Sequence, residues 1–194
     1  MRVLITGGSG FIGTAAVNWA LQQDFKVINF DTNPPKKSEH QPYWQCVDIT
    51  QEAKFSRAIL EFDPTHIWHL AAKTGMDIRD ISQLDANTKA VECLIQTVKS
   101  LSNIRRILFT SSLLVCRNGY VPTTDTDYCP PNLYGKSKVI GEKSIREGNI
   151  PCEWVIVRPT SIWGPWFEHS YRAFFKAIDR GVYLQPSAEP IVKP

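Results

Sequence analysis

Short apolar runs alternate with amphipathic helical segments along the chain, and this alternation limits the fold more than any other feature. Runs rich in β-branched and aromatic residues predict strands at residues 2–6, 26–30, 43–49, 66–71, 105–111 and 152–159. Apolar residues at helical spacing predict helices at residues 11–23, 50–61, 85–100, 134–146 and 171–179. Strands that alternate with helices form a parallel sheet that is covered on both faces. The expected class is therefore α/β, with reactive groups at the carboxyl ends of the strands.

Local signals refine the ends of these elements. Thr50 is the expected N-cap of the second helix, and Gly181 is expected to end the last one. Prolines and polar residues predict a loop at 33–42, and a short strand is expected at 182–184.

Composition argues against partners of two classes. The chain of 194 residues has a net charge of +3, and its Lys and Arg residues are scattered without a dense basic tract. This pattern does not indicate binding to nucleic acid. No run of about 18 apolar residues predicts a membrane span, and the N-terminus lacks the pattern of a secretory signal. We therefore expect a cytoplasmic protein without a membrane partner.

Neither the cysteines nor the histidines predict a cross-link or a metal site. The five cysteines are odd in number and widely spaced, which favours reduced thiols over a disulfide framework. His66 and His69 lie three residues apart in a predicted strand, where that spacing points the two rings to opposite faces. We therefore expect no metal.

The segment TGGSGFIG joins the first predicted strand to the first predicted helix. Its glycines, Gly7, Gly10 and Gly13, permit a tight turn, let the backbone approach a pyrophosphate, and let helix and strand pack closely. The amino end of the helix offers N–H groups and a partial positive charge to phosphates. We therefore expect a Rossmann-type dinucleotide site that includes Phe11 and Ile12, the alternative being a glycine-rich turn without a ligand.

Asp31 ends the second predicted strand, 18 residues after Gly13. A carboxylate at this place accepts hydrogen bonds from an adenosine ribose and repels a 2′-phosphate, which favours NAD over NADP. Lys36 and Lys37 follow closely and would suit a phosphate. NAD is therefore the expected cofactor, and NADP stays an alternative.

Tyr134 and Lys138 lie four residues apart in YGKSK, on one face of a predicted helix. The pKa of a tyrosine is ordinarily near ~10, too high for a base at neutral pH. A nearby lysine ammonium and the positive nicotinamide ring of NAD favour the phenolate and lower that pKa. The pair indicates an acid–base tyrosine, although the same spacing occurs by chance in many helices.

Seven motifs follow one another along the chain: TGGSGFIG, VDIT, HLAA, DANT, TSS, YGKSK and RPTSIWGP. Their order and spacing resemble those of the extended short-chain dehydrogenases/reductases, the NAD-dependent sugar-nucleotide epimerase/dehydratase family. The resemblance runs along essentially all 194 residues, and the motifs are highly specific as a set.

The resemblance implies catalytic roles for three residues. Ser112 would bind the substrate hydroxyl that is oxidised, and Tyr134 would take and return its proton. Lys138 would hold the nicotinamide ribose and tune Tyr134.

The resemblance also implies contacts along the cofactor. Asp48 and Ile49 would border the adenine, and Ala71, Ala72 and Lys73 would lie along the dinucleotide.

Further implied contacts lie near the nicotinamide. Asn87 would support the site, Pro159 and Thr160 would pass the nicotinamide, and Ser161 would turn toward the substrate.

Several of these residues also have readings without a ligand. Asp48 suits a cap at a strand end, and Asn87 suits an exposed helix face. Ser161 and Trp163 suit structural roles, and the turn at Trp163 and Trp166 fits core packing as well as a surface that stacks on a nucleobase.

The residues after Thr110 separate the reactions of this family. The 4,6-dehydratases that resemble this chain carry an Asp-Glu pair there, and decarboxylating relatives place a Glu nearby. This chain has Ser111, Ser112, Leu113 and Leu114, which cannot exchange protons at neutral pH as carboxyl groups do. We therefore expect neither dehydration nor decarboxylation.

Together these features predict an NAD-dependent epimerase, or a dehydrogenase, that acts on a nucleotide-diphosphate sugar. One alternative is a reductase of a non-sugar carbonyl, such as a steroid or a flavonoid. Another is a non-catalytic dinucleotide-binding regulator, against which the intact Ser112, Tyr134 and Lys138 argue.

The expected organisation has two parts. Residues 1–160 would form the NAD-binding Rossmann domain, and residues 161–194 would begin a substrate-binding region that is largely missing, because the chain stops at the proline-rich AEPIVKP. Relatives commonly pair helices into dimers, so we expect a homodimer through the helix at 85–100 and the helix of Tyr134.

Overall fold

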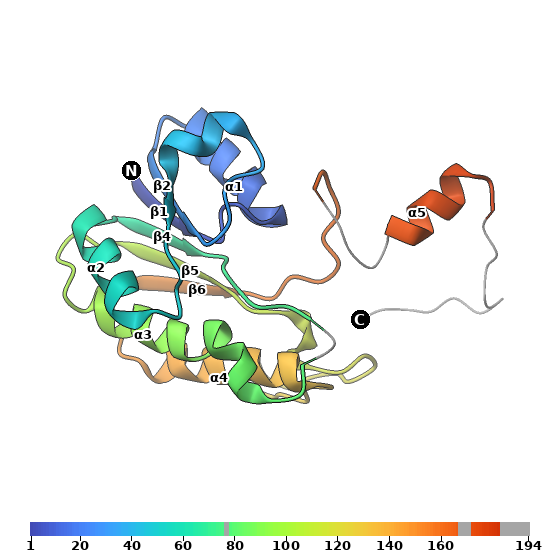
Figure 1. The fold of residues 1–194 in the computed structure, drawn as a ribbon. Coiled ribbons are helices and arrows are strands. Elements are labelled where there is room, and N and C mark those ends of the chain that lie inside the picture. Colours follow the sequence, from blue (N-terminus) through green and yellow to red (C-terminus); the bar gives the residue numbers. More distant parts are fainter. Residues whose placement is uncertain (76–77, 167–171, 183–194) are drawn as a thin grey trace.

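Parallel strands form one sheet in the computed structural model, which describes residues 1–75, 78–166 and 172–182. The order across the described sheet is β3-β2-β1-β4-β5-β6 (Figure 1). The strands are β1 (Arg2–Thr6), β2 (Lys26–Asp31), β3 (Trp44–Cys46), β4 (His66–His69), β5 (Arg106–Thr110) and β6 (Glu153–Val157). The predicted doubly wound α/β class is confirmed. Its strand order changes direction at β1, and open parallel sheets bind ligands at such a point.

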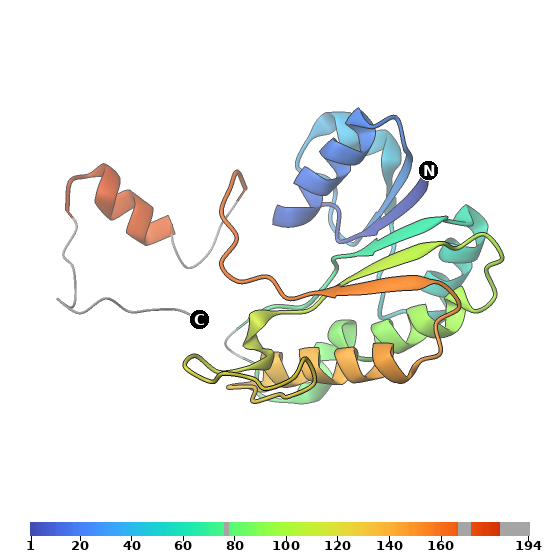
Figure 2. The same cartoon turned by 180° about the vertical axis from the view of Figure 1, so that it is seen from behind.

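Helices cover both faces of the sheet. They are α1 (Phe11–Gln22), α2 (Glu52–Phe62), α3 (Lys89–Val98), α4 (Leu133–Glu147) and α5 (Arg172–Asp179). Three short 3-10 helices connect them: η1 (Ser38–Tyr43), η2 (Ile81–Asn87) and η3 (Leu113–Val115). The views from the front and from behind place α1 on one side of the sheet and α2, α3 and α4 on the other (Figures 1 and 2).

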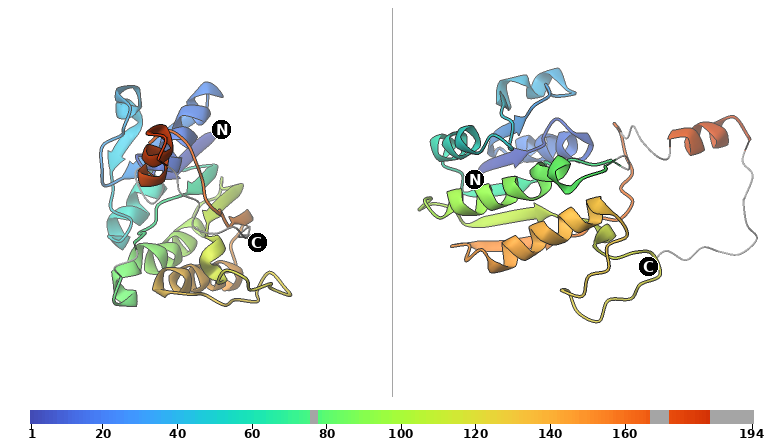
Figure 3. Two further views of the ribbon diagram at one scale, coloured as in Figure 1. Left: turned by 90° about the vertical axis from the view of Figure 1, so that its right-hand side faces the viewer. Right: turned by 60° about the horizontal axis from the view of Figure 1, so that its bottom comes forward.

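Two apolar clusters hold these layers together, because alternate residues of each strand point to opposite faces. The larger cluster includes Phe55 of α2, Leu94 of α3 and Ile145 of α4. The smaller one packs Val17 and Ala20 of α1 against the other face of β1 and β2. Helices α3 and α4 lie side by side across the larger cluster (Figure 3), so α4 is anchored along its length.

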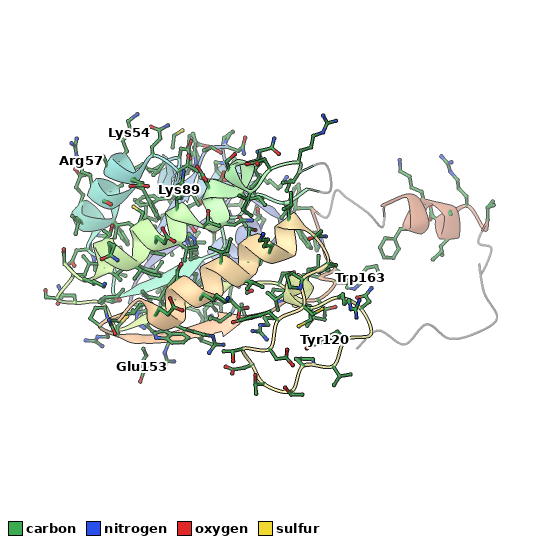
Figure 4. All side chains as sticks on the ribbon, turned by 90° about the horizontal axis from the view of Figure 1, so that it is seen from below. Lys54, Arg57, Lys89, Tyr120, Glu153 and Trp163 are labelled. Carbon is green, nitrogen blue, oxygen red and sulfur yellow. The ribbon has the colours of Figure 1, made fainter. Side chains whose placement is uncertain are left out.

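The outer side of the α2–α3 layer is strongly charged. Lys54 and Arg57 on α2 and Lys89 on α3 point away from the sheet (Figure 4). Along the described residues, no helix has the length and apolarity that a membrane crossing requires.

Several predicted boundaries are wrong for local reasons. Thr50 does not cap α2, because its hydroxyl and its N–H both donate to Asp48 Oδ1, at 2.7 and 2.9 Å, and Gln51 takes the N-cap position. The helix predicted at 85–100 is split, because η2 ends at Asn87 and the backbone of Thr88 leaves helical geometry before α3 begins. The strand expected at 182–184 falls on residues of which only Val182 is described.

Helix α5 stands apart from the sheet and the other helices (Figures 1 and 2). The ring of Phe175 on α5 meets the ring of Trp163 edge-on, with 5.2 Å between the ring centroids. Trp163 therefore has a packing partner beyond the six-stranded part of the fold.

Candidate active site

The glycine loop after β1 is shaped by close backbone contacts. Gly7 has a φ of +73°, and a Cβ atom there would lie 2.8 Å from the backbone of Ala71. A Cβ atom on Gly13 would lie 2.0 Å from the carbonyl oxygen of Gly7. Gly10 is the N-cap of α1 and no side chain caps this end. The loop is therefore a backbone cradle, open at a helix amino end, and it fits a pyrophosphate.

Replacing Gly13 with alanine is expected to weaken NAD binding by at least about tenfold and to lower the melting temperature. The new Cβ forces α1 away from the loop, because the atom that it meets is backbone. Gly10→Ala is the comparison, since its Cβ atom meets Gly7 O at 3.2 Å and needs a smaller shift. Calorimetric titration with NAD checks this, and equal affinities of the Gly13 variant and the unmodified protein would contradict it.

A cavity of about 1000 Å³ opens beside this loop, over the carboxyl ends of β1, β2 and β4. Eleven residues predicted to bind the cofactor line it: Gly7, Gly10, Phe11, Ile12, Gly13, Asp31, Asp48, Ile49, Ala71, Ala72 and Lys73. The volume is ample for a dinucleotide, whose two nucleotides span such a crevice. The cavity also has lining residues that sequence reasoning missed, among them Ser9, Thr32 and Asn33.

Asp31 is held at the rim of the cavity by two backbone groups. Its Oδ2 accepts the N–H of Ser9 at 3.1 Å, and its Oδ1 accepts the N–H of Asn33 at 2.9 Å. Lys36 lines the same cavity, whereas Lys37 bonds Asn18 at 3.0 Å and pairs with Glu39 at 3.3 Å. The carboxylate is therefore fixed where a ribose would lie, with Lys36 as the nearer of the two lysines.

Replacing Asp31 with asparagine is expected to reduce the preference for NAD over NADP by about tenfold or more, because the carboxylate charge that repels a 2′-phosphate is lost. The amide keeps the acceptor for one of the two N–H groups, so the loop should hold its shape. Dissociation constants for both coenzymes measure the ratio, and an unchanged ratio would rule out Asp31 as its source.

Asn87 lies behind the cavity and joins two parts of the site. It is 2% exposed, so the reading as an exposed helix residue is wrong. Its Oδ1 accepts the N–H of Lys73 at 2.8 Å, and its Nδ2 donates to Lys73 O at 2.9 Å and to Ser137 Oγ at 3.0 Å. The Ser137 hydroxyl in turn donates to the carbonyl of Tyr134 at 2.7 Å. Asn87 thus connects the segment along the cofactor cavity with the first turn of α4.

Asp48 bonds the backbone before α2 and also lines the cavity, and its contact with adenine stays a prediction. It accepts two hydrogen bonds from Thr50, which lower its pKa below the ordinary value. Its carboxylate is therefore charged at neutral pH and fixed before α2 begins.

Ser112, Tyr134 and Lys138 meet at the carboxyl end of β5. Asn132 starts α4 by accepting the N–H of Gly135 at 2.8 Å, which brings Tyr134 into the first helical turn. The Lys138 ammonium lies 5.9 Å from the centroid of the Tyr134 ring and donates to the carbonyl of Thr110 at 2.9 Å. Ser112 Oγ accepts the N–H of Leu114 at 3.1 Å, which fixes the hydroxyl at the start of η3.

Burial shifts the pKa values of this cluster in opposite senses. Burial raises the pKa of Tyr134 above its ordinary value, and a hydrogen bond with Ser112 opposes this rise. Burial also lowers the pKa of Lys138 to about 8, and the charge of Glu142 opposes that fall. The protein alone therefore does not make Tyr134 a base at neutral pH, and the nicotinamide charge would have to supply the rest.

The end of β6 completes the site. Pro159 accepts the N–H of Leu113 at 3.0 Å, and so ties the RPTSIWGP segment to the segment of Ser112. Ser161 is half-buried, and the residues from 162 to 166 are exposed. Trp166 lines the cofactor cavity, whereas Trp163 is half exposed and meets Phe175 of α5 rather than the core. Stacking of Trp166 on a nucleobase stays a prediction.

Neither a cross-link nor a metal cluster accompanies the site. All five cysteines are free thiols, as the sequence predicts. In the part of the chain that the structure describes, His, Cys, Asp and Glu residues form no group suited to a metal ion.

Known proteins of similar sequence include two kinds of enzyme. The chain is 29% identical to N-acetyl-alpha-D-glucosaminyl-diphospho-ditrans,octacis-undecaprenol 4-epimerase of Escherichia coli O157:H7, over 96% of the chain and 56% of the relative. It is 26% identical to 3-beta-hydroxysteroid dehydrogenase of Mycolicibacterium neoaurum, over 93% of the chain and 52% of the relative. The chain therefore spans little more than half the length of these relatives.

A solved structure shares the fold. The Bordetella bronchiseptica enzyme WbmG in complex with NAD and UDP superposes with a TM-score of 0.78 at 26% identity, over 93% of this chain and 60% of that one.

The family match agrees with the geometry of the site. Residues 3–189 match the NAD dependent epimerase/dehydratase family. The matched range includes the glycine loop, the helix of Tyr134 and the segment after β6. The chain therefore belongs to the NAD-dependent epimerase/dehydratase family, and its cofactor is the NAD that the sequence predicts.

Proposed function

We propose that the protein is an NAD-dependent epimerase of a nucleotide-diphosphate sugar. One observation carries the proposal: Ser112, Tyr134 and Lys138 converge at the carboxyl end of β5, and among the described residues the carboxyl group bonded to this serine segment is the buried Glu142. Glu142 is 1% exposed, and its Oε1 already accepts the Ser111 hydroxyl. A dehydratase or decarboxylase needs an acid that reaches the substrate, so hydride transfer alone is the better-supported reaction.

Three residues of this chain have distinct roles in the proposed reaction. Ser112 holds the sugar hydroxyl, and Tyr134 takes its proton as the C–H bond breaks. Lys138 holds a positive charge beside Tyr134, anchored on Thr110 O, and favours the phenolate. NAD, when bound, supplies the acceptor and then the donor of the hydride. Tyr134 gives its proton back when the ketone is reduced from its other face, so the reaction has no net oxidation.

Binding energy from the nucleotide would position the sugar against the reacting groups. WbmG was solved in complex with UDP, which supports a nucleotide-linked substrate. The Escherichia coli relative is by name a 4-epimerase of a sugar joined through a diphosphate to undecaprenol, which supports a diphosphate-linked sugar but not the nucleotide. Trp166 lines the cofactor cavity and adds an aromatic surface there.

A second candidate is reduction of a non-sugar carbonyl, or the reverse oxidation of the corresponding hydroxyl, which the steroid dehydrogenase relative favours. Incubating the full-length protein and NAD with UDP-, dTDP- and GDP-hexoses, and separately with 3β-hydroxysteroids, distinguishes the two. An epimer that forms without net NADH supports the proposal. NADH formation with the steroids, and no reaction with any of the nucleotide sugars, would overturn it. The homodimer through α3 and α4 and the cytoplasmic location also stay proposals, and the mass of the protein in solution tests the first.

A further inference from the structure

A carboxylate is buried behind the catalytic side chains. Glu142 lies on α4 one turn after Lys138 and two turns after Tyr134, and it is 1% exposed. Buried carboxylates are costly unless they are paired and hydrogen-bonded. Packing alone therefore does not explain a charged residue at this position.

Glu142 accepts hydrogen bonds from three other segments. Its Oε1 accepts Ser111 Oγ at 2.5 Å and Arg158 Nε at 2.8 Å. Its Oε2 accepts Tyr128 OH at 2.9 Å and Arg158 Nη2 at 2.5 Å. Burial raises the pKa of Glu142, but the hydrogen bonds from Arg158, Ser111 and Tyr128 together lower it by more. The net pKa is below the ordinary value of a glutamate. The group is therefore an ionised carboxylate at neutral pH.

These three donors flank the catalytic groups along the chain. Ser111 precedes Ser112 at the end of β5, and Arg158 precedes Pro159, which bonds Leu113. Tyr128 lies in the loop that also carries Tyr120, and this loop passes beside the start of α4 (Figure 4). Glu142 thus joins α4 to both strand ends that form the substrate side.

Glu142 is also the negative charge that faces Lys138. Both side chains line a small cavity of about 20 Å³ together with His69, Thr110 and Ser111. Burial and the charge of Lys138 lower the pKa of His69 to about 3, so this ring is neutral and adds no charge at neutral pH.

Two arginines also contact the carboxylate. Arg158 bonds both carboxylate oxygens, and Arg146 approaches Oε2 at 4.0 Å while pairing with Asp125 at 2.8 Å. Among the described groups, the charge that supports the protonated form of Lys138 is that of Glu142.

We propose that Glu142 is a positioning residue, whose carboxylate keeps Lys138 protonated and holds the Ser111–Ser112 segment against α4. The inference rests on the proposed function for the role of Lys138, but the interaction itself does not depend on the substrate. Glu142 touches neither substrate nor cofactor cavity, so it acts through Lys138 and Ser111.

Glu142→Gln tests the charge while keeping the size. The basic limb of the pH profile of kcat/KM is expected to move down by about one pH unit, because Lys138 loses the charge that opposes its deprotonation. Glu142→Asp keeps the charge and should keep the limb in place, even where its shorter reach lowers kcat. Glu147→Gln makes the same change at an exposed position of α4 and should leave the basic limb and kcat unchanged.

A misfolded variant is separated from a loss of charge by a second substitution. Glu142→Gln leaves Arg158 without its main partner, so the single variant is expected to melt at a lower temperature. The double variant Glu142→Gln with Arg158→Gln removes both charges and should recover part of the melting temperature, while the basic limb stays shifted. If the double variant regained both its melting temperature and the original position of the basic limb, the proposal would be overturned, because Glu142 would then have a structural role only.

A substrate-free readout keeps this inference distinct from the proposed reaction. The phenolate absorbance of Tyr134 at alkaline pH, with NAD bound and the spectrum of the Tyr134→Phe variant subtracted, reports its pKa. Glu142→Gln is expected to raise this pKa, because a less charged Lys138 supports the phenolate less. A raised value without turnover of any sugar would refute the proposed function alone. An unchanged value would refute the role of Glu142.

Discussion

Replacing Tyr134 with phenylalanine is expected to lower turnover by about 1,000-fold or more and to leave NAD affinity within about twofold. The substitution removes the hydroxyl that takes and returns the proton, and nothing else on the substrate side changes. Tyr134 lies outside the lining of the cofactor cavity, so the substitution should leave the glycine loop, Asp31 and Asp48 in place for the proposed contacts with NAD. Steady-state kinetics and NAD titration measure the two effects separately.

The matched control is Tyr43→Phe, which removes the same hydroxyl from an exposed ring at the end of η1. It should keep full activity. If Tyr134→Phe retained more than about a tenth of normal turnover, another group would have to carry the proton, and the mechanism would be wrong.

Replacing Lys138 with methionine is expected to lower turnover by about 100-fold or more. Methionine fills much of the same buried space but cannot donate to Thr110 O or hold a charge beside the Tyr134 ring. Lys136→Met is the control, since Lys136 is exposed on the same helix two residues earlier. Equal effects of the two substitutions would contradict a specific role for Lys138.

The pH dependence gives this prediction a second readout. With the pKa of Lys138 at about 8 in the folded protein, activity that needs its charge should fall as the pH rises through about 8. The folded pKa is below the ordinary value of 10.5, so the unfolded chain binds more protons between these two values. The free energy of unfolding should therefore rise with pH across that window. Lys138→Met should lose this rise, which chemical denaturation at several pH values would show.

The sequence predicted the sheet and the cofactor side of the site well because their signals are local. Gly7, Gly10 and Gly13 stand between a strand and a helix, and the structure shows the backbone contacts that require them. Asp31 follows from the same βαβ unit. These features are set by residues within one short stretch of chain, so periodicity and spacing suffice to find them.

The contacts that escaped prediction join residues that are distant in sequence. The resemblance placed Asn87 at the site, and an exposed helix face was the alternative, but neither showed the kink at Thr88 that turns Asn87 toward Lys73 and Ser137. The Glu142 network joins residues that lie 14 to 31 positions apart in sequence, and neither spacing nor periodicity marks such pairs. Trp166 reaches the cofactor cavity only because the chain after β6 returns to it.

Transfer of an isotopic label tests the central claim most directly. A nucleotide sugar deuterated at the carbon that changes configuration is incubated with the full-length protein and NAD, and product and coenzyme are analysed by mass spectrometry. An epimerase returns the label to the sugar, so the epimer should keep its deuterium and no labelled NADH should accumulate. Net transfer of the label to NADH, or an epimer that has exchanged its deuterium with solvent, would contradict the proposed reaction.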